Sequence, residues 1–284
     1  MYKQIIKQPN IRGIAAGAIA TGEIPTVGTH YGTYLRCLSA AGVALTPAQI
    51  KTDVGDIIIR INGVQIVEAS ATFLLDLQKY YGDNIGAGNV NGIIPLSWAR
   101  PHLATDQERS VFALGMADVS SFTIDVKVTG VAVLSSIEVL SEVTPEVRRL
   151  GQHIRINKFP QSFATTGLQE ITTLPKEGND VGYLALYIEE SAGAVDKVTV
   201  KLGGNNIFEE VDPYLNQVLL EKTLRNPQAG YFHVAFDRSN DLSGLIPMVG
   251  VQDFRQQITW NTAAGAPGNY NIYTERIFGL NVKK

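Results

Sequence analysis

The sequence predicts an all-β fold of two tandem eight-stranded jelly rolls, each with a short helix in a long connection. Three observations lead to this prediction. Most segments are short, rich in Val, Ile, Thr and Tyr, and separated by Gly, Asn, Asp or Pro, which is typical of a β-sandwich. Two segments instead have helical periodicity. The order of elements around the first helix repeats around the second, about 140 residues later.

The first helix is expected to begin after Ser70, whose hydroxyl can cap it. Its apolar side chains share one face and are Ala71, Leu74, Leu77 and Tyr81. The second helix is expected to begin with Pro213 after the capping residue Asp212. The side chains predicted to face inward there are Leu215, Val218 and Leu219. Lys222 and Arg225 are predicted to lie in its last turn, where cations interact favourably with the helix dipole.

The repeat holds for three elements. A strand with a following turn precedes each helix, at residues 56–63 and 196–203, which are 140 residues apart. The helix centres at Leu77 and Val218 are 141 residues apart, and Arg100 and Arg238 end the next strands at a separation of 138. Repeats of this length are whole domains, because each can bury its own core.

We expect the two domains to divide near Val143 to Gly151, where Pro145 interrupts a β-like run and cannot donate to a sheet. The predicted domains are residues 1–145, which include an N-terminal arm, and residues 146–284. Sandwiches of this size with one helix in a long crossing connection fit the jelly roll better than an immunoglobulin-type sandwich.

The composition narrows the function. A net charge of −3 and a pI near 5.8 give no electrostatic basis for binding nucleic acid directly. A single cysteine, Cys37, and the lack of a glycosylation sequon disfavour a secreted scaffold and favour synthesis in a reducing cytoplasm. The apolar run at residues 13–20 is rich in Ala and Gly and shorter than the roughly 20 residues of a bilayer span, so we do not interpret it as a signal peptide.

Four short segments carry a family resemblance. They are Ile-Ala-Ala-Gly at 14–17, Thr-Pro-Ala-Gln-Ile-Lys at 46–51, Trp-Ala-Arg-Pro at 98–101 and Val-Phe-Ala-Leu-Gly at 111–115. In order and spacing the chain resembles the double-jelly-roll major capsid proteins of corticovirus-like phages, which are membrane-containing icosahedral bacteriophages. The segments lie in about the first 130 residues, and element order supports the second half.

The resemblance implies a structural protein of the virion, made in the cytoplasm of a bacterial host. It implies a homotrimer whose six jelly rolls imitate a hexagonal tile over an internal membrane. The implied partners are other copies of the chain, neighbouring capsomers, penton proteins, minor capsid or membrane proteins and the viral membrane surface.

No catalytic or cofactor-binding residues are expected. The sequence lacks a Gly-x-Ser-x-Gly elbow, a His-Glu-x-x-His pair and a Walker lysine loop, and its four histidines are scattered. The glycine-rich stretch at 86–92 follows a helix rather than opening one, so it is interpreted as a flexible loop and not as a phosphate site. Cys37 is expected to be an inert, buried side chain.

One metal site is a candidate. The turn from Asp237 to Asp241 presents oxygen ligands that could hold calcium, which the resemblance also implies, although a metal-free turn is the favoured interpretation. Lys3, Lys7 and Arg12 form a basic arm that could contact anionic lipid or a neighbouring subunit, with an ordinary solvated tail as the alternative.

Two rival functions are a carbohydrate- or receptor-binding jelly-roll module and a glycoside-active enzyme. The enzyme would need two facing carboxylates. The adjacent pairs at 189–190 and 209–210 should point to opposite faces of a strand and are expected at exposed strand ends. Trp98 and Trp260, in similar places of the two halves, are expected to pack in the core rather than stack on sugars.

Overall fold

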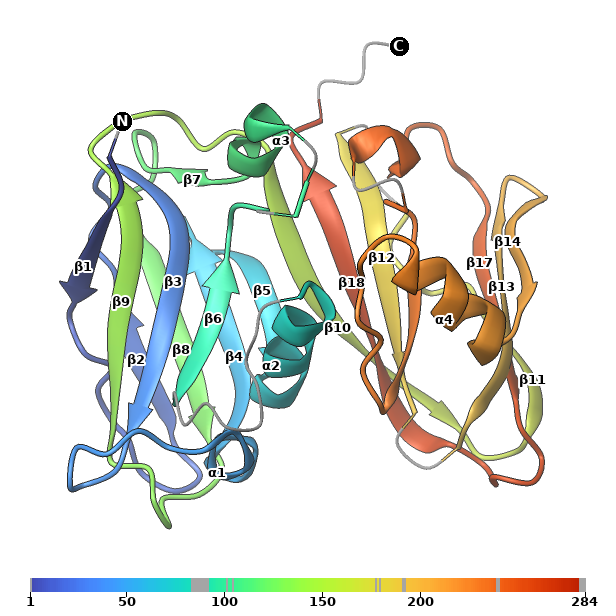
Figure 1. Cartoon of the computed structure of the whole chain (residues 1–284), viewed down its shortest axis with the longest axis horizontal. Helices are drawn as coiled ribbons and strands as arrows, with labels where there is room; N and C mark the ends of the chain where they lie inside the picture. The colour runs from blue at the N-terminus through green and yellow to red at the C-terminus, as the bar shows by residue number, and fades with distance from the viewer. Residues whose placement is uncertain are drawn as a thin grey trace. The chain divides into compact units, whose positions relative to one another are not determined.

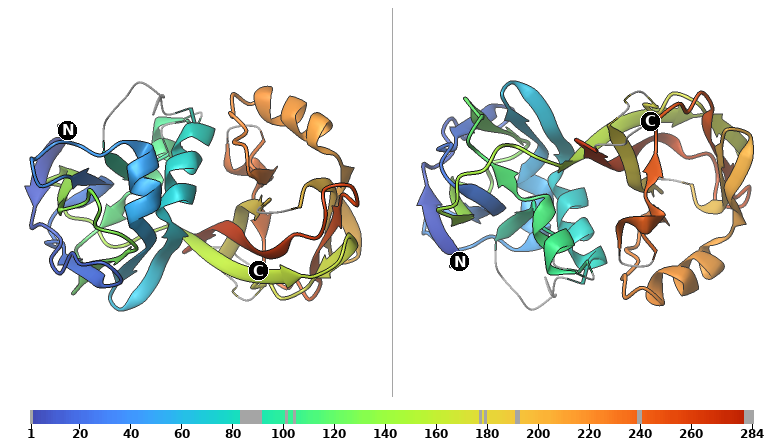
Figure 2. Two further views of the ribbon diagram at one scale, coloured as in Figure 1. Left: turned by 90° about the horizontal axis from the view of Figure 1, so that it is seen from below. Right: turned by 90° about the horizontal axis from the view of Figure 1, so that it is seen from above.

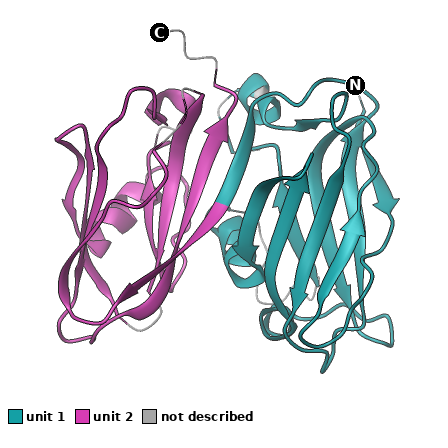
Figure 3. Ribbon diagram, turned by 180° about the vertical axis from the view of Figure 1, so that it is seen from behind, with its two compact units in different colours: residues 1–156 teal, residues 157–284 magenta. Residues whose placement is uncertain are grey.

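The computed structural model describes residues 2–82, 92–100, 102–103, 105–176, 178, 180–190, 193–238 and 241–280. The chain folds into two compact units, residues 1–156 and 157–284 (Figures 1 and 3). The division between them falls inside strand β10 (His153–Phe163), a few residues after the predicted region Val143 to Gly151. That predicted region covers the end of β9 (Ser136–Thr144) and most of the connection to β10.

Unit 1 is built from two sheets. In sheet order, the strands of the first are β1 (Gln4–Gln8), β9, β3 (Thr29–Leu38) and β6 (Ile93–Ser97), with β7 (Leu114–Gly115) also paired to β3. Those of the second are β10, β5 (Val64–Ser70), β4 (Val54–Ile61), β8 (Phe122–Val128) and β2 (Ile19–Glu23). Strand β10 joins β5 in parallel, with Ile156 opposite Val67.

The alternation of side chains fixes which face of these strands is buried. In β8, Phe122, Ile124, Val126 and Val128 are buried, while the residues between them are polar and more exposed. Apolar and polar residues alternate in the sequence of this strand with the same period of two.

Unit 2 also contains two sheets. The strands of one are β11 (Gly167–Ile171), β17 (Phe254–Trp260), β13 (Val195–Leu202) and β14 (Asn205–Val211). Those of the other are β15 (Tyr231–Ala235), β12 (Val181–Glu189), β18 (Gly268–Phe278) and β10, with β16 (Ile246–Pro247) on β12. Eight of the nine residues of β12 are buried, so this strand is central to the unit. Large apolar side chains fill the core, among them Tyr183, Phe254 and Trp260.

The two predicted helices exist. Helix α2 (Ala71–Tyr80) begins after the capping residue Ser70, and α4 (Pro213–Glu221) begins after Asp212. Each follows a hairpin with a two-residue turn whose residues both have positive φ, Asn62-Gly63 in unit 1 and Gly203-Gly204 in unit 2. Turns with this backbone match the twist of paired strands, which explains the glycines.

Three short helical segments were not predicted. They are α1 (Pro47–Asp53), α3 (Asp106–Val111) and the 3-10 turn η1 (Leu242–Gly244). Thr46 with Gln49 and Thr105 with Glu108 form capping boxes at α1 and α3. These Thr-x-x-Gln/Glu spacings are sequence signals that could have identified both helices.

The predicted inward face of α4 is wrong for Leu215 and Val218, which are exposed, and confirmed for Leu219, which is half-buried and packs against the core. Asn216 and Leu220 are the buried residues of the helix. The helix also ends earlier than predicted, at Glu221, so Arg225 lies beyond its last turn. Helix α4 is drawn in orange at the periphery of unit 2 in Figure 2. Among the described residues, no helix is long and apolar enough to cross a bilayer.

Candidate assembly surfaces

The repeat seen in the sequence has a counterpart in side-chain geometry. The Arg100 guanidinium donates to the carbonyl oxygen of Ser97 at 3.1 Å, and the Arg238 guanidinium donates to that of Ala235 at 3.0 Å. Each arginine thus bonds the backbone three residues earlier, at the end of its strand. Each also lies over an aromatic ring, Arg100 over Tyr81 and Arg238 over Phe208, at 5.2 and 4.8 Å from the ring centre.

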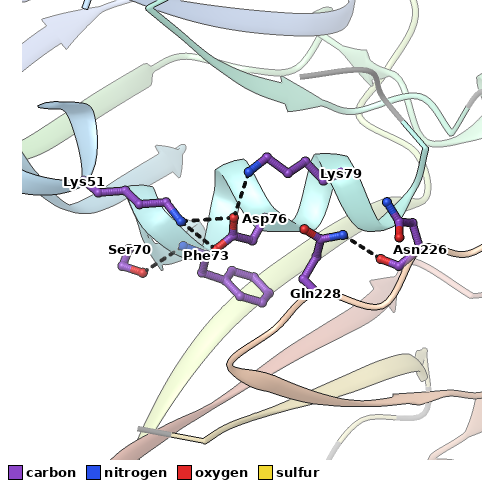
Figure 4. Close-up of polar contacts among 7 residues, drawn as sticks. All are labelled: Lys51, Ser70, Phe73, Asp76, Lys79, Asn226 and Gln228. Carbon is purple, nitrogen blue, oxygen red and sulfur yellow. Dashed lines mark hydrogen bonds and ion pairs between the residues drawn. The ribbon is translucent and has the colours of Figure 1, made fainter. Parts of the chain in front are cut away.

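Helix α2 is held from several sides within unit 1. The Ser70 hydroxyl accepts the Phe73 amide at 3.1 Å, and the Asp76 carboxylate binds the ammonium groups of Lys51 on α1 and Lys79 on α2 itself (Figure 4). The helix also packs against β4, β5 and β6. Eight of its ten residues are buried, and the two half-buried ones, Thr72 and Lys79, share one narrow side of the helix.

Within the described residues, the contacts of helix α4 lie on its inner side. The Asp212 carboxylate accepts the Leu215 amide at 2.9 Å, and the Asn216 side-chain amide donates to the carbonyl oxygen of His233 at 2.8 Å. Of the strands, β13 and β15 pack against it. In the loop that follows, Gln228 donates to the Asn226 carbonyl at 2.8 Å (Figure 4).

A buried ion pair anchors the chain after α4. The Arg225 guanidinium lies 2.8 Å from the Asp237 carboxylate, and the two side chains are only 2% and 4% exposed. Asp237 follows strand β15, so the pair ties the exit of the helix to the strand that the chain enters next. This pairing was not predicted, because the sequence pattern indicated the last turn of the helix for Arg225 and a separate turn for Asp237.

The outer side of α4 is apolar and exposed. Within unit 2, the exposed large apolar side chains of α4 and the turn after it are Tyr214 (85%), Leu215 (48%), Val218 (51%) and Leu224 (84%). On a helix, residues three and four apart are neighbours, so Val218 adjoins both Tyr214 and Leu215. We call these four residues the α4 patch.

The basic arm is an ordered strand and not a solvated tail. Residues 4–8 form β1, which pairs with β9 at the edge of its sheet. Lys3 lies 2.9 Å from Glu142 and Lys7 lies 2.5 Å from Glu138, while the Lys3 ammonium also lies over the Tyr31 ring. Arg12 is exposed and lines an open groove of about 560 Å³ between the arm and β2.

The two predicted calcium ligands bind other groups of the protein. Asp237 binds Arg225, and the Asp241 carboxylate caps η1 by accepting the Ser243 amide at 2.8 Å. Within the described ranges no three His, Cys, Asp or Glu residues are grouped so as to hold a metal ion. Residues 239–240 of this turn lie outside the described residues, as do residues 83–91, which include most of the glycine-rich loop. Calcium at Asp237 and Asp241 therefore stays a prediction.

Two histidines and the cysteine are buried and uncharged near neutral pH. Desolvation lowers the pKa of His30 to about 4 and that of His233 to about 3. Burial, with the nearby Asp53 carboxylate, raises the pKa of Cys37 to about 12, so this thiol is not a nucleophile near neutral pH.

The acidic pairs serve local structure. The carboxylate of Glu189 accepts the Asn271 amide, and that of Glu190 accepts the Val195 amide. Both are half-buried, contrary to the expected exposure, and burial raises the pKa of Glu190. Glu209 and Glu210 are exposed, as expected.

The tryptophans lie in the core, as predicted. The Trp98 indole donates to the Thr33 hydroxyl at 3.1 Å, and the Trp260 indole donates to the Gln169 side chain at 2.9 Å. They do not occupy equivalent places, since Trp98 follows β6, the counterpart of β15, whereas Trp260 ends β17.

Comparison with known proteins agrees with this geometry. The family models for the N-terminal and C-terminal domains of viral coat protein P2 match residues 5–144 and 154–280. The major capsid protein P2 of bacteriophage PM2 is similar in structure, with a TM-score of 0.83 and 17% identity over 98% of this chain and 97% of that one. The STIV MCP has a TM-score of 0.69 and 10% identity, with 98% and 97% covered. The PBCV-1 virus capsid protein has a TM-score of 0.64 and 12% identity, with 98% and 95% covered. No curated protein matches the chain in sequence.

Proposed function

Because this chain belongs to the viral coat protein P2 family, we propose that it forms the shell of an icosahedral, membrane-containing bacterial virus as a homotrimeric capsomer. Family membership makes it a structural capsid protein and not an enzyme. Its double-jelly-roll fold, shared with the capsid proteins described above, is the architecture that such a capsomer requires.

The repetition of one design in both units is the observation that carries the proposal. Each unit has a tight hairpin, a capped helix and a strand followed by an arginine bonded to its end. Three copies of such a chain provide six similar units, so a closed ring can meet six neighbours as a hexagonal tile does. The differences between the units then give the tile only threefold symmetry and a fixed orientation.

This role implies specific partners in the virion. We propose that they are neighbouring capsomers, penton proteins, minor capsid or membrane proteins and the viral membrane. We also propose that the chain is made in the cytoplasm of the bacterial host. The arm residues Lys3, Lys7 and Arg12 are exposed, and we assign them contacts with an anionic lipid surface or a neighbouring subunit. Because Lys3 and Lys7 are paired with glutamates of β9, Arg12 supplies most of the positive charge for such a contact. A net charge of −3 gives no support for direct contact with the genome.

Sedimentation of the purified chain at micromolar concentrations tests the trimer. We expect one species with three times the 30.8 kDa mass of the chain, because a permanent interface should bury more than ~2,000 Å². A species of 30.8 kDa that does not change with concentration would contradict the homotrimeric capsomer.

If the chain binds calcium, we propose that Asp237 and Asp241 supply ligands, because the turn from Asp237 to Asp241 is the densest local cluster of oxygen side chains in the sequence. Asp241 is the residue to change, because loss of Asp237 would leave Arg225 buried without its partner. If calcium binds at this turn, calorimetric titration with calcium should give heat for the wild type and for the control Asp253→Asn, and none for Asp241→Asn. Equal heats for all three would remove calcium from this turn.

A further inference from the structure

Helix α4 has apolar side chains on two opposite sides. Leu220 faces the core of unit 2, while Tyr214, Leu215 and Val218 face away from it. A surface helix normally has a polar outer face, and a helix that is apolar all round is normally buried. The exposed side of α4 is therefore unlike a surface that faces water permanently.

The equivalent helix of unit 1 shows what the outer side of α4 lacks. Helix α2 follows the same hairpin and the same type of N-cap, and eight of its ten residues are buried within the chain. Helix α1 packs on it, in addition to three strands. In the described part of unit 2, no counterpart of α1 precedes α4, since strands alone lie between β10 and α4 in the chain.

We propose that the α4 patch is a subunit interface and that a second copy of this chain covers it. The inference rests on the proposed ring of three subunits and names the surface that closes it. In a ring in which first and second units alternate, each second unit is followed by the first unit of another copy. The ring thus gives every second unit a neighbour from another copy, without a free end, and the α4 patch contains most of the exposed large apolar side chains in the described part of that unit.

The chemistry of the patch fits this partner. Its centre consists of Tyr214, Leu215 and Val218, and its border is polar, with Gln217, Glu221 and Lys222. An apolar centre with a polar rim is the usual composition of a specific protein interface, and tyrosine is enriched among the residues that carry binding energy. The patch has no cluster of basic residues that would favour a lipid surface instead.

Charge placed in the patch tests the proposal. We expect the double variant Leu215→Glu, Val218→Glu to sediment as a folded monomer at concentrations where the wild type is a trimer. The dissociation constant should rise by at least about 100-fold, because two charges would be buried without partners. The matched control is Leu168→Glu, which changes a similarly exposed leucine on β11 of the same unit and should remain trimeric.

Single cysteine variants provide a second test, which does not require the protein to fold with new charges on α4. Cys37 is buried and its pKa is raised to about 12, so an introduced cysteine is the reactive thiol of the chain. In the wild-type background, Val218→Cys should be protected from a maleimide in the trimer and become reactive on dissociation, whereas Leu168→Cys should react in both states.

Two outcomes separate this inference from the proposed function. A wild-type monomer would contradict the capsomer itself. If the wild type is a trimer but the Val218→Cys variant reacts as fast as the Leu168→Cys variant, or the double glutamate variant stays trimeric, the capsomer stands and the assignment of the α4 patch is overturned.

Discussion

Helices α2 and α4 occupy the same place in two copies of one design, yet they are held in different ways. Helix α2 is largely buried, and the carboxylate of its Asp76 forms ion pairs with two half-exposed lysines. Helix α4 is covered on one side and is fixed by the fully buried pair of Arg225 and Asp237 behind its end. Local signals thus set where each helix begins, and the surroundings set what stabilises it.

The difference separates two kinds of ion pair. Exposed pairs contribute up to about 1 kcal/mol, because water screens them. Removing one member of a buried pair costs about 3–5 kcal/mol, because the remaining charge stays buried without compensation. The stability of unit 2 should therefore depend more on the carboxylate of Asp237 than that of unit 1 depends on the carboxylate of Asp76.

The largest effect is expected for Asp237→Ala. This change should lower the free energy of unfolding of unit 2 by about 3–5 kcal/mol, since Arg225 remains buried. Asp76→Ala in unit 1 should cost only about 1 kcal/mol, because its lysine partners are about one-third exposed. Urea unfolding of both variants at one protein concentration would measure the two losses.

Apolar replacement of both partners is the control for this prediction. The double variant Arg225→Met, Asp237→Leu should recover most of the stability that Asp237→Ala loses, since no uncompensated charge remains. Equal losses for Asp76→Ala and Asp237→Ala would show that the two units do not differ in this respect.

Acid should weaken both units. His30 of unit 1 and His233 of unit 2 have folded-state pKa values of about 4 and about 3, below the ordinary value of 6.5. Their neutral forms favour the fold fully above pH 6.5, and this stability is lost as the pH falls towards the folded values. Each histidine should lower the free energy of unfolding by up to about 3 kcal/mol by pH 4, because it takes up its proton at a higher pH in the unfolded chain than in the folded protein.

Replacing each histidine with glutamine would show whether it causes the loss of stability in acid. His30→Gln should flatten the fall of stability between pH 6.5 and 4, and His233→Gln should do the same. The comparison is between each variant and the wild type, since carboxylates titrate in the same range. A slope unchanged in both variants would exclude the histidines as its source.

Elements set by local sequence could be predicted. Ser70 and Asp212 cap their helices because their side chains reach amides three residues ahead, and the glycines at 63 and 203–204 permit tight hairpins. The period-two strands and the buried tryptophans follow in the same way from side-chain size and spacing.

Elements set by distant contacts could not be predicted. Leu215 and Val218 were expected inward because they are apolar, but the amide of Asn216 finds a partner in the carbonyl of His233 and turns the helix accordingly. Asp237 has the composition of a metal ligand, and only the fold shows that Arg225 reaches it. An interface residue and a core residue are both apolar, so sequence alone does not separate them.

The smallest effect tests the feature that the two helices share. Ser70→Ala and Asp212→Ala each remove the side-chain oxygen that accepts an amide in the first turn, at 3.1 and 2.9 Å in the native fold. Each should lower the free energy of unfolding by about 1 kcal/mol, measured by urea unfolding.

The difference between the two caps is more informative than the loss of stability measured for either one. Asp212 brings a negative charge to the N-terminus of α4, where the helix dipole favours it, whereas Ser70 offers only a neutral hydroxyl. Asp212→Asn keeps the capping hydrogen bond and removes the charge, so it should lower the free energy of unfolding less than Asp212→Ala does. The loss should still be larger than that of Ser70→Asn, which removes no charge. High salt should reduce the loss in Asp212→Asn, because it screens the dipole, and should leave Ser70→Ala unchanged. If Asp212→Asn is as stable as the wild type at low salt, hydrogen bonding alone fixes where α4 begins, and the two helices start by one mechanism in both halves of the chain.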